Sequence, residues 1–277
     1  TAYVGSIDIW RTTNGGTNFT NITNGYGGGI VHVDQHNVDF HPTDANQMIC
    51  VNDGGIWKSA NKGTNWTNLN TNLTLTQFYR IASDPSNANH ILGGTQDNGT
   101  QRTTGTLNWT AAYGGDGGEV CFHAKNNSYI LGETQNNGVF RSTDGGISWG
   151  SAESGISGSG TWIGPIISHP DSNGIFYTAR QQVFKTTDWG AFWFAISSGT
   201  SGTIREMAIS RTSANIMYAT SGNLIYKSTN RGYTFTDVST GLPNVTITSV
   251  NIHPDSSQVA IITFSGFGAG KIYKTTN

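Results

Sequence analysis

The stretch RSTDGGISW, residues 141–149, contains a pattern that returns along the whole chain. The pattern is Ser/Thr, any residue, Asp/Asn, any residue, Gly, any two residues and an aromatic residue. Further complete copies occupy residues 12–19, 59–66, 186–193 and 228–235. A shortened copy, TTGTLNW, occupies 103–109, and a seventh begins at Thr275. The first residues of successive copies are 39 to 47 positions apart. A period of this length is typical of stacked or radial repeat architectures.

The residue types of the pattern predict a tight turn that satisfies its own polar groups. The Ser/Thr and Asp/Asn side chains can accept hydrogen bonds from nearby backbone N–H groups. The glycine permits a positive φ, and the aromatic ring covers the hairpin at the start of the next strand. We expect the Asp/Asn position to be structural in each complete copy, namely at Asn14, Asn61, Asp144, Asp188 and Asn230.

These turns resemble the Asp box of sialidases, sortilin-type receptors and xyloglucanase-type glycoside hydrolases. The resemblance implies a β-propeller in which each box joins the third and fourth strands of a blade, away from the ligand face. In agreement, the sequence between the turns divides into four strands per repeat. The innermost strand of each repeat is apolar at nearly every position, as expected for burial on both sides, and the outer strands alternate.

The sequence therefore predicts an all-β fold, a β-propeller of about seven four-stranded blades with incomplete first and last blades. Six blades remain an alternative if the amino-terminal strands close the last blade. We expect residues 1–277 to form a single propeller domain that is part of a longer secreted protein.

Composition excludes several classes of partner. Charged residues make up 12% of the chain, the net charge is −2 and the pI is near 6.3, so no basic surface is present to bind nucleic acid or an anionic membrane. No run of 18 apolar residues exists, so we expect no membrane insertion. Cys50 and Cys121 fall on different predicted strands and are expected to be buried free thiols. The histidines of the His-Pro pairs at His41, His169 and His253 are expected to be turn residues.

Candidate ligand-binding residues lie on the face opposite the repeat turns, where the turns between second and third strands and the links between blades meet. There the blades differ from one another, and a chain poor in charge gathers acidic residues. Clustered carboxylates need a cation, a shared proton or ligand hydroxyls to compensate them. The predicted ligand-binding residues are His36, Asp53, Gln96, Asp97, Asp116, Glu119, Glu133 and Gln135.

Alternative explanations exist for part of this set. Asp-Gly and Asn-Gly pairs are favoured in tight hairpin turns, so Asp53, Asp97 and Asn137 could be present only for a positive φ. No cofactor is expected, although calcium near Asp116 and Glu119 is an open alternative.

A second alternative concerns the start of the second blade. His32, Asp34 and His36 occupy alternate positions and are predicted to point to one side of a strand, as a metal or acid/base site would require. A zinc site lacks a third matched motif elsewhere in the sequence.

The segment from VHVDQH (residues 31–36) to RSTDGGISW also resembles propeller domains of large secreted Bacteroidetes proteins, described as sortilin-like or BNR-repeat proteins and exported by type IX secretion. The resemblance implies an extracellular or cell-surface location, with the rest of a larger polypeptide as a partner. Sialidase activity is not expected, because the arginines do not fit the sialidase motifs and the Arg-Ile-Pro motif is absent.

We expect a non-catalytic binding or scaffold domain that recognises a glycan or a protein through the acidic face. Tyr79, Tyr113 and Trp162 could stack on sugars. The alternative is a glycoside hydrolase of xyloglucanase-like type, with Asp34 and Asp116 as its paired carboxylates. A purely structural module is the third possibility.

Overall fold

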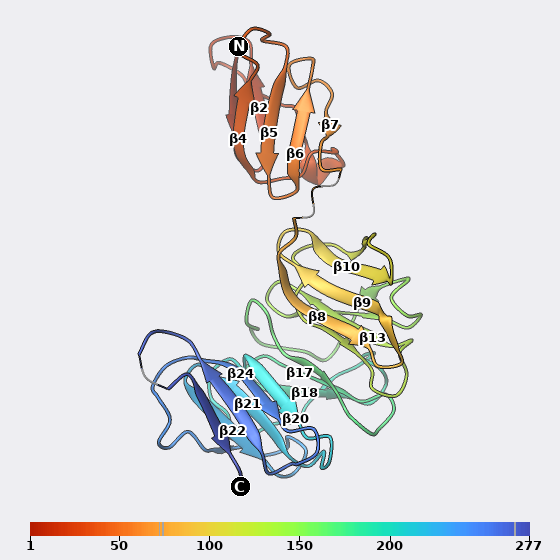
Figure 1. The fold of residues 1–277 in the computed structure, drawn as a ribbon, viewed down its shortest axis with the longest axis vertical. Helices are drawn as coiled ribbons and strands as arrows, with labels where there is room; N and C mark the ends of the chain where they lie inside the picture. The colour runs from red at the N-terminus through yellow and green to blue at the C-terminus, as the bar shows by residue number, and fades with distance from the viewer. Residues whose placement is uncertain (72, 74, 269) are drawn as a thin grey trace. The chain divides into compact units, whose positions relative to one another are not determined.

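The computed structural model describes residues 1–277 except 72, 74 and 269, and most of its regular structure is β-strand (Figure 1). The chain divides into two compact units, Thr1–Gln77 (unit 1) and Phe78–Asn277 (unit 2), and each is described by itself. The one helix among the described residues is the short 3-10 helix η1 (Gly25–Gly27). None of these residues forms a helix with the length and apolar character needed to cross a membrane.

Unit 1 contains two antiparallel sheets. The first has three strands, β1 (Ala2–Gly5), β2 (Ile9–Thr12) and β3 (Thr20–Asn21). The second has four strands, β4 (Gln35–Phe40), β5 (Met48–Asn52), β6 (Gly55–Ser59) and β7 (Thr67–Asn68).

Unit 2 contains five antiparallel sheets, four of them four-stranded. The first sheet contains β8 (Phe78–Asp84), β9 (Asn87–Thr95), β10 (Gly99–Thr104) and β11 (Thr110–Tyr113). The second sheet contains β12 (Val120–Phe122), β13 (Ile130–Thr134), β14 (Gly138–Ser142) and β15 (Gly150–Ser151). The third sheet contains β16 (Ile166–Ser168), β17 (Phe176–Ala179), β18 (Val183–Thr186) and β19 (Phe194–Ala195). The fourth sheet contains β20 (Glu206–Ile209), β21 (Met217–Ser221), β22 (Leu224–Ser228) and β23 (Thr236–Asp237). The last sheet has three strands, β24 (Ile247–Ile252), β25 (Ala260–Phe264) and β26 (Ile272–Thr275).

The sheets follow the order of the chain, and within each sheet every strand pairs with the next one. In unit 2 the first strands of successive sheets lie against one another: β12 contacts β8 and β16, and β20 contacts β16 and β24. The described residues thus form five four-stranded and two three-stranded sheets, and the three-stranded ones are the first and the last. This confirms the predicted all-β propeller fold class with incomplete end blades. The single domain over residues 1–277 stays a prediction.

The cores lie between successive sheets. Leu131, Phe176, Phe184 and Trp193 are at most 1% exposed and form one such layer between the sheets β12–β15 and β16–β19. The prediction that the innermost strands are buried on both sides was wrong. The second strand β17 is buried at all four positions, whereas the first strand β16 is fully buried at one of three. A second strand is covered by a neighbouring sheet on each face, but a first strand lies at the inner edge of its sheet.

The repeat turns join the third and fourth strands, as predicted. In the turn between β14 and β15 the Ser142 hydroxyl donates to Asp144 Oδ1 (2.7 Å) and accepts from the Gly146 N–H (2.8 Å). The same carboxylate oxygen accepts from the Ser148 N–H at 2.9 Å. These hydrogen bonds lower the pKa of Asp144 well below its usual range, with Ser148 the largest cause.

The other four complete turns repeat this geometry. The first residue accepts from the glycine N–H at 2.8 to 3.0 Å, and the Asp/Asn side chain accepts from the N–H four residues on at 2.8 to 3.0 Å; the Asp/Asn residues are Asn14, Asn61, Asp188 and Asn230. In the shortened copy the Thr103 hydroxyl instead donates to the Thr106 carbonyl (2.8 Å), because no Asp/Asn stands two residues on. The predicted local chemistry of the complete turns is therefore confirmed.

Two smaller predictions are also tested by the structure. The His169 and His253 side chains accept backbone N–H hydrogen bonds through Nδ1 in the turns after β16 and β24, as expected for turn residues. Cys50 and Cys121 are free; Cys50 is buried and Cys121 is partly exposed. The prediction of burial thus holds in full only for Cys50.

Candidate functional site

The predicted ligand-binding residues divide between the two units. His36 and Asp53 lie in unit 1, and the other six lie in unit 2. Asp34 and Asp116, the predicted catalytic pair, also lie in different units. That pair therefore stays a prediction, and the geometry of each unit is considered separately.

In unit 1 the expected His32, Asp34 and His36 arrangement is wrong. Strand β4 begins only at Gln35, and Asp34 has a φ of 63°, so the three residues are not alternate positions of one strand. His36 lies where the pairing of β4 with β5 shifts register. Its Nε2 instead contacts Asp53 Oδ1, and the His36 side chain is 64% exposed. Unit 1 thus offers an exposed His-Asp pair at the start of β4.

The turn residues show which carboxylates serve the backbone. At the turn between β5 and β6 the positive φ belongs to Gly55 (108°) and not to Asp53, so the tight-turn explanation fails for Asp53. Asp97 and Asn137 do have positive φ values, 60° and 58°. The Asp97 N–H donates to Asp116 Oδ1, and Asp116 is 6% exposed. Asp116 therefore holds the turn between β9 and β10.

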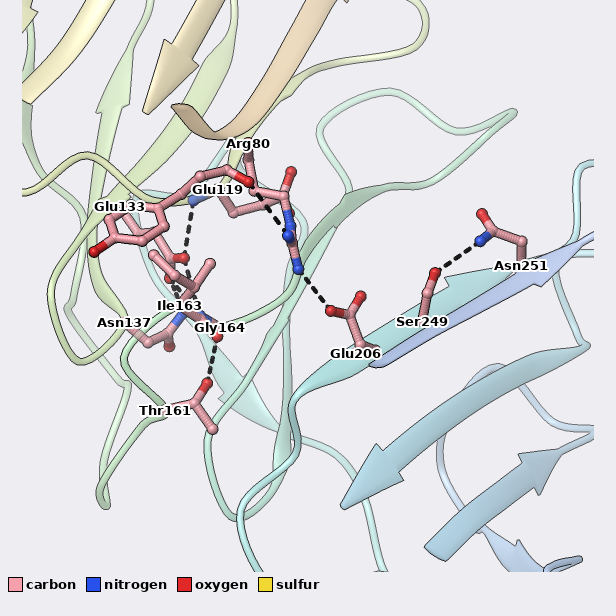
Figure 2. A network of polar contacts seen from close by, with 11 residues as sticks. Arg80, Glu119, Glu133, Asn137, Thr161, Ile163, Gly164, Glu206, Ser249 and Asn251 are labelled. Atoms are coloured by element: carbon pink, nitrogen blue, oxygen red, sulfur yellow. Dashed lines mark hydrogen bonds and ion pairs between the residues drawn. The ribbon is translucent and has the colours of Figure 1, made fainter. Parts of the chain in front are cut away.

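Glu133, in β13, is a completely buried carboxylate that joins three segments. Its Oε1 accepts from the Glu119 and Gly164 N–H groups, both at 2.9 Å, and its Oε2 accepts from Asn137 Nδ2 at 2.7 Å. Figure 2 shows Asn137 and Gly164 next to Glu133. Burial raises the pKa of Glu133 to about 8, although the three donors oppose this shift. Glu133 therefore connects β13 to the links before β12 and β16 and is not available to a ligand.

Arg80 carries the central polar contact of unit 2. Its Nε donates to Glu119 Oε2 (3.2 Å) and its Nη2 to Glu206 Oε1 (2.7 Å), so one guanidinium joins the carboxylates of two other blades (Figure 2). The Arg80 side chain is 41% exposed, and the two glutamates are 23% and 21% exposed. Because both oxygens accept hydrogen bonds from the same guanidinium, the carboxylates of Glu119 and Glu206 lie close together.

The register of the strands explains this convergence. Ile81, Val120 and Met207 pair with Gly93, Gly132 and Ala219 at the same level of their sheets. Each is preceded by one of the three charged residues. Arg80, Glu119 and Glu206 therefore occupy equivalent positions of the first strands or the links entering them. These positions lie towards the ends of β9, β13 and β21 that face away from the repeat turns.

The electrostatics of this group are set by burial and by the single arginine. Burial raises the pKa of Glu119 to about 7, with Arg80 opposing the shift and Glu206 adding to it. Burial also raises the pKa of Glu206, again opposed by Arg80. Glu119, which shares its cation with Glu206, is thus poised to take up a proton near neutral pH.

Of the three candidate stacking aromatics, two are linked to this group through Tyr79, which directly precedes Arg80. Trp162 is 49% exposed, and its Nε1 donates to the hydroxyl of Tyr79, the neighbour of Arg80, at 3.4 Å. Tyr113 instead stacks on Phe140, with ring centroids 3.9 Å apart, and so packs within the fold. We call Tyr79, Arg80, Glu119, Trp162 and Glu206 the Arg80 cluster. Gln96 and Gln135 lie in the neighbouring turns after β9 and β13 and are partly exposed.

Arg80 and Glu206 were missed as site residues by the sequence reasoning. The signal that would have found them is a charged residue at the same place in several apolar first strands, in FYRIAS and IREMAI. The metal alternatives gain no support: in the part of the chain that the structure describes, no group of three or more His, Cys, Asp or Glu residues is arranged to hold a metal ion.

Comparisons with solved structures show the fold. An ancestral GH74 enzyme has a TM-score of 0.62 at 20% identity, covering 87% of this chain and 36% of that one. The GH74 xyloglucanase from Xanthomonas campestris has a TM-score of 0.52 at 17% identity, with 99% and 50% covered. YCF48 bound to D1 peptide has a TM-score of 0.52 at 18% identity, with 72% and 63% covered. The chain thus spans less than two thirds of each. No protein-family model and no curated protein sequence matches it.

Proposed function

We propose that this chain is a non-catalytic ligand-binding β-propeller domain and that it recognises a glycan through the Arg80 cluster. The observation that carries the proposal is Trp162, a half-exposed indole hydrogen-bonded to Tyr79. Tyr79 directly precedes Arg80, whose guanidinium joins two carboxylates. Sugar recognition combines an aromatic face with fixed hydrogen-bonding groups, because a sugar ring has apolar C–H faces and hydroxyl edges. The cluster offers both on the side away from the repeat turns.

The ion pairs favour binding over hydrolysis. A glycoside hydrolase needs one carboxylic acid and one carboxylate on either side of the scissile bond. In unit 2 the two neighbouring carboxylates, Glu119 and Glu206, hold the same guanidinium between them. A sugar could enter that space only by displacing Arg80, and this would leave two carboxylates without their cation.

The alternative is a glycoside hydrolase of xyloglucanase-like type. The raised pKa values of Glu119 and Glu206 favour it, since hydrolases use a carboxyl group that is still protonated near neutral pH. The name of one structural neighbour, a GH74 xyloglucanase, indicates xyloglucan as the first substrate to try. The pair Asp34 and Asp116 belongs to the same alternative.

We also propose that the domain works outside the cell or on its surface, as a sortilin-like Asp-box propeller exported by type IX secretion. The five repeat turns with one hydrogen-bonding pattern support the Asp-box assignment. Detection of the parent protein in culture medium or by surface labelling of intact cells tests the location.

The ligand proposal is tested by calorimetry and reducing-sugar release with xyloglucan and a panel of other polysaccharides, with calcium or with a chelator. Trp162→Ala should weaken glycan binding at least about fivefold, since loss of an aromatic anchor that costs about 1 kcal/mol lowers the affinity by that factor. Tyr233→Ala is the matched control, because Tyr233 is also 49% exposed but belongs to a repeat turn.

The outcomes distinguish glycan binding from glycoside hydrolysis. Saturable binding without sugar release, weakened only by Trp162→Ala, supports the proposal. Sugar release that disappears in Glu119→Gln or Asp116→Asn would establish the hydrolase instead. No glycan binding, or equal effects of the two aromatic substitutions, would refute glycan recognition by the cluster. A peptide panel would then be the next assay, since one structural neighbour is named with a bound peptide.

A further inference from the structure

Trp162 lies on the longest link between two sheets of unit 2. This link, residues 152–165, joins β15 to β16 and is named the Trp162 link below. The other links of unit 2 are residues 114–119, 196–205 and 238–246. Within the Trp162 link, residues 154–160 have the sequence SGISGSG. A chain of glycine and serine is flexible unless other groups hold it, so the position of the indole depends on what holds this segment.

The two ends of the Trp162 link are held by hydrogen bonds. At its start the Ser154 carbonyl accepts from the backbone N–H of the tryptophan in the next repeat turn, at 2.9 Å. At its end the Asn136 N–H donates to the Trp162 carbonyl at 3.1 Å. The Gly164 N–H donates to Glu133 Oε1 at 2.9 Å, and Figure 2 shows these two residues next to each other. These bonds leave the glycine- and serine-rich middle of the link without support.

Arg180, in the turn between β17 and β18, holds that middle. Its Nη1 donates to the Gly158 carbonyl at 3.0 Å. Its Nη2 donates to the Asn137 carbonyl at 2.9 Å and to Glu153 Oε1, at the start of the link, at 2.5 Å. The Arg180 side chain is only 14% exposed, so water competes little for these bonds. In the part of the chain that the structure describes, no other hydrogen bond reaches residues 157–160.

The equivalent residues of the other sheets act within their own turns. In each four-stranded sheet of unit 2, one residue of the second strand pairs with the first residue of the repeat turn. Four positions further on stand Thr95, Thr134, Arg180 and Ser221. The two threonine hydroxyls donate to carbonyls of their own turns, at 2.6 and 3.3 Å. A short hydroxyl side chain is thus enough for such a turn, whereas Arg180 reaches out of its turn to the link that carries Trp162.

We propose that Arg180 is a positioning residue of the glycan site, which fixes the middle of the Trp162 link so that the indole is held at Tyr79 before a ligand binds. The inference rests on the proposed function, because it takes Trp162 as the residue that contacts the sugar. A link that is ordered beforehand loses no further conformational entropy on binding, and this raises the affinity. A link that presents the indole for only a fraction of the time lowers the affinity in proportion to that fraction.

The first test follows Trp162 without any ligand. The protein is labelled with fluorotryptophan, and the fluorine NMR signals of Trp162 and Trp149 are assigned by Trp→Phe substitutions. Trp149 is the internal reference for the fold, since its Nε1 donates to the Gly146 carbonyl within its own repeat turn. In Arg180→Ala the Trp162 signal should move towards that of free fluorotryptophan while the Trp149 signal stays in place. Gln182→Ala, at an exposed position of the same turn as Arg180, is the matched control and should change neither signal.

The second test measures affinity by calorimetry with xyloglucan as the probe. Arg180→Ala should raise the Kd about three- to tenfold, as expected if the link then presents the indole for between about a third and a tenth of the time. Arg180→Lys keeps the charge but replaces a planar fork of donors with a single ammonium group. It should hold fewer of the three acceptors and give an intermediate Kd and an intermediate Trp162 signal. If Arg180→Ala does not fold, Arg180→Lys decides on the same two measurements.

An unchanged Trp162 signal in the Arg180 variants would overturn the proposal. Signals of Trp162 and Trp149 that move together would also overturn it, because Arg180 would then support the fold as a whole. Equal Kd values for the wild type and Arg180→Ala would have the same consequence. If the wild type binds neither xyloglucan nor any other polysaccharide of the panel, the proposed function fails, and the fluorine signals still decide whether Arg180 positions Trp162.

Discussion

Glu133 should make unit 2 less stable as the pH rises, and Glu133→Gln should remove that dependence. The folded-state pKa of Glu133 is raised, from 4.5 to about 8, chiefly by burial. Below pH 4.5 both the folded and unfolded forms carry the proton. Between pH 4.5 and 8 the unfolded form ionises while the folded form keeps its proton, so the unfolded form is favoured increasingly. Above pH 8 both forms are ionised and the loss is complete.

The magnitude follows from the size of the shift. Each pKa unit corresponds to 1.36 kcal/mol, so the change from 4.5 to about 8 amounts to about 5 kcal/mol across this pH range. A free energy of this size is comparable with the whole stability of many domains. The three N–H donors to the Glu133 carboxylate favour its ionised form and so oppose this loss of stability.

The assay is urea unfolding of the wild type and of Glu133→Gln at pH values from 5 to 9, followed by tryptophan fluorescence. The free energy of unfolding of the wild type should fall over this range, and that of the glutamine variant should fall much less. The variant should be the less stable protein at pH 5, because its amide N–H₂ meets N–H donors. A pH slope that is the same in both proteins would show that Glu133 is ionised when folded, and burial would then be the weaker effect.

Three further predictions concern other parts of the chain. Ser142→Ala should destabilise the protein to urea by about 1–3 kcal/mol, because a buried hydroxyl that both donates and accepts in its turn is lost; Thr103→Ala, in the shortened turn, should cost less. In the same urea assay, Arg80→Ala should lower the free energy of unfolding by about 1–2 kcal/mol at pH 8 and by less at pH 5. The pKa of Glu119 is about 7, so at pH 5 its carboxyl group is largely protonated and its ion pair with Arg80 contributes less. Cys50 is 1% exposed with its pKa raised to about 12, so it should react with a thiol reagent at pH 8 only after denaturant is added; fast reaction of this thiol without denaturant would contradict the burial.

The candidate site shows where sequence reasoning reached its limit. The search for acidic residues on variable turns found Glu119, but it also selected Asp116 and Glu133, which hold the turn after β9 and the link before β16. A carboxylate that binds a ligand and one that accepts backbone N–H groups have the same appearance in a sequence. Only the hydrogen-bond partners distinguish them. Trp162 and Tyr113 were likewise indistinguishable until the structure placed one at the surface and the other on Phe140.

The repeat, its turns and the order of the strands could be predicted from the amino-acid sequence. These follow from interactions within a few residues: Ser142 reaches Asp144 and Gly146 without leaving its own turn. The contacts of Arg80 with Glu119, 39 residues away, and with Glu206, 126 residues away, could not be predicted in this way. Such contacts depend on the curvature with which successive sheets pack and on the register of each first strand. Local patterns carry neither quantity, because both arise from the side-chain packing of whole sheets against their neighbours.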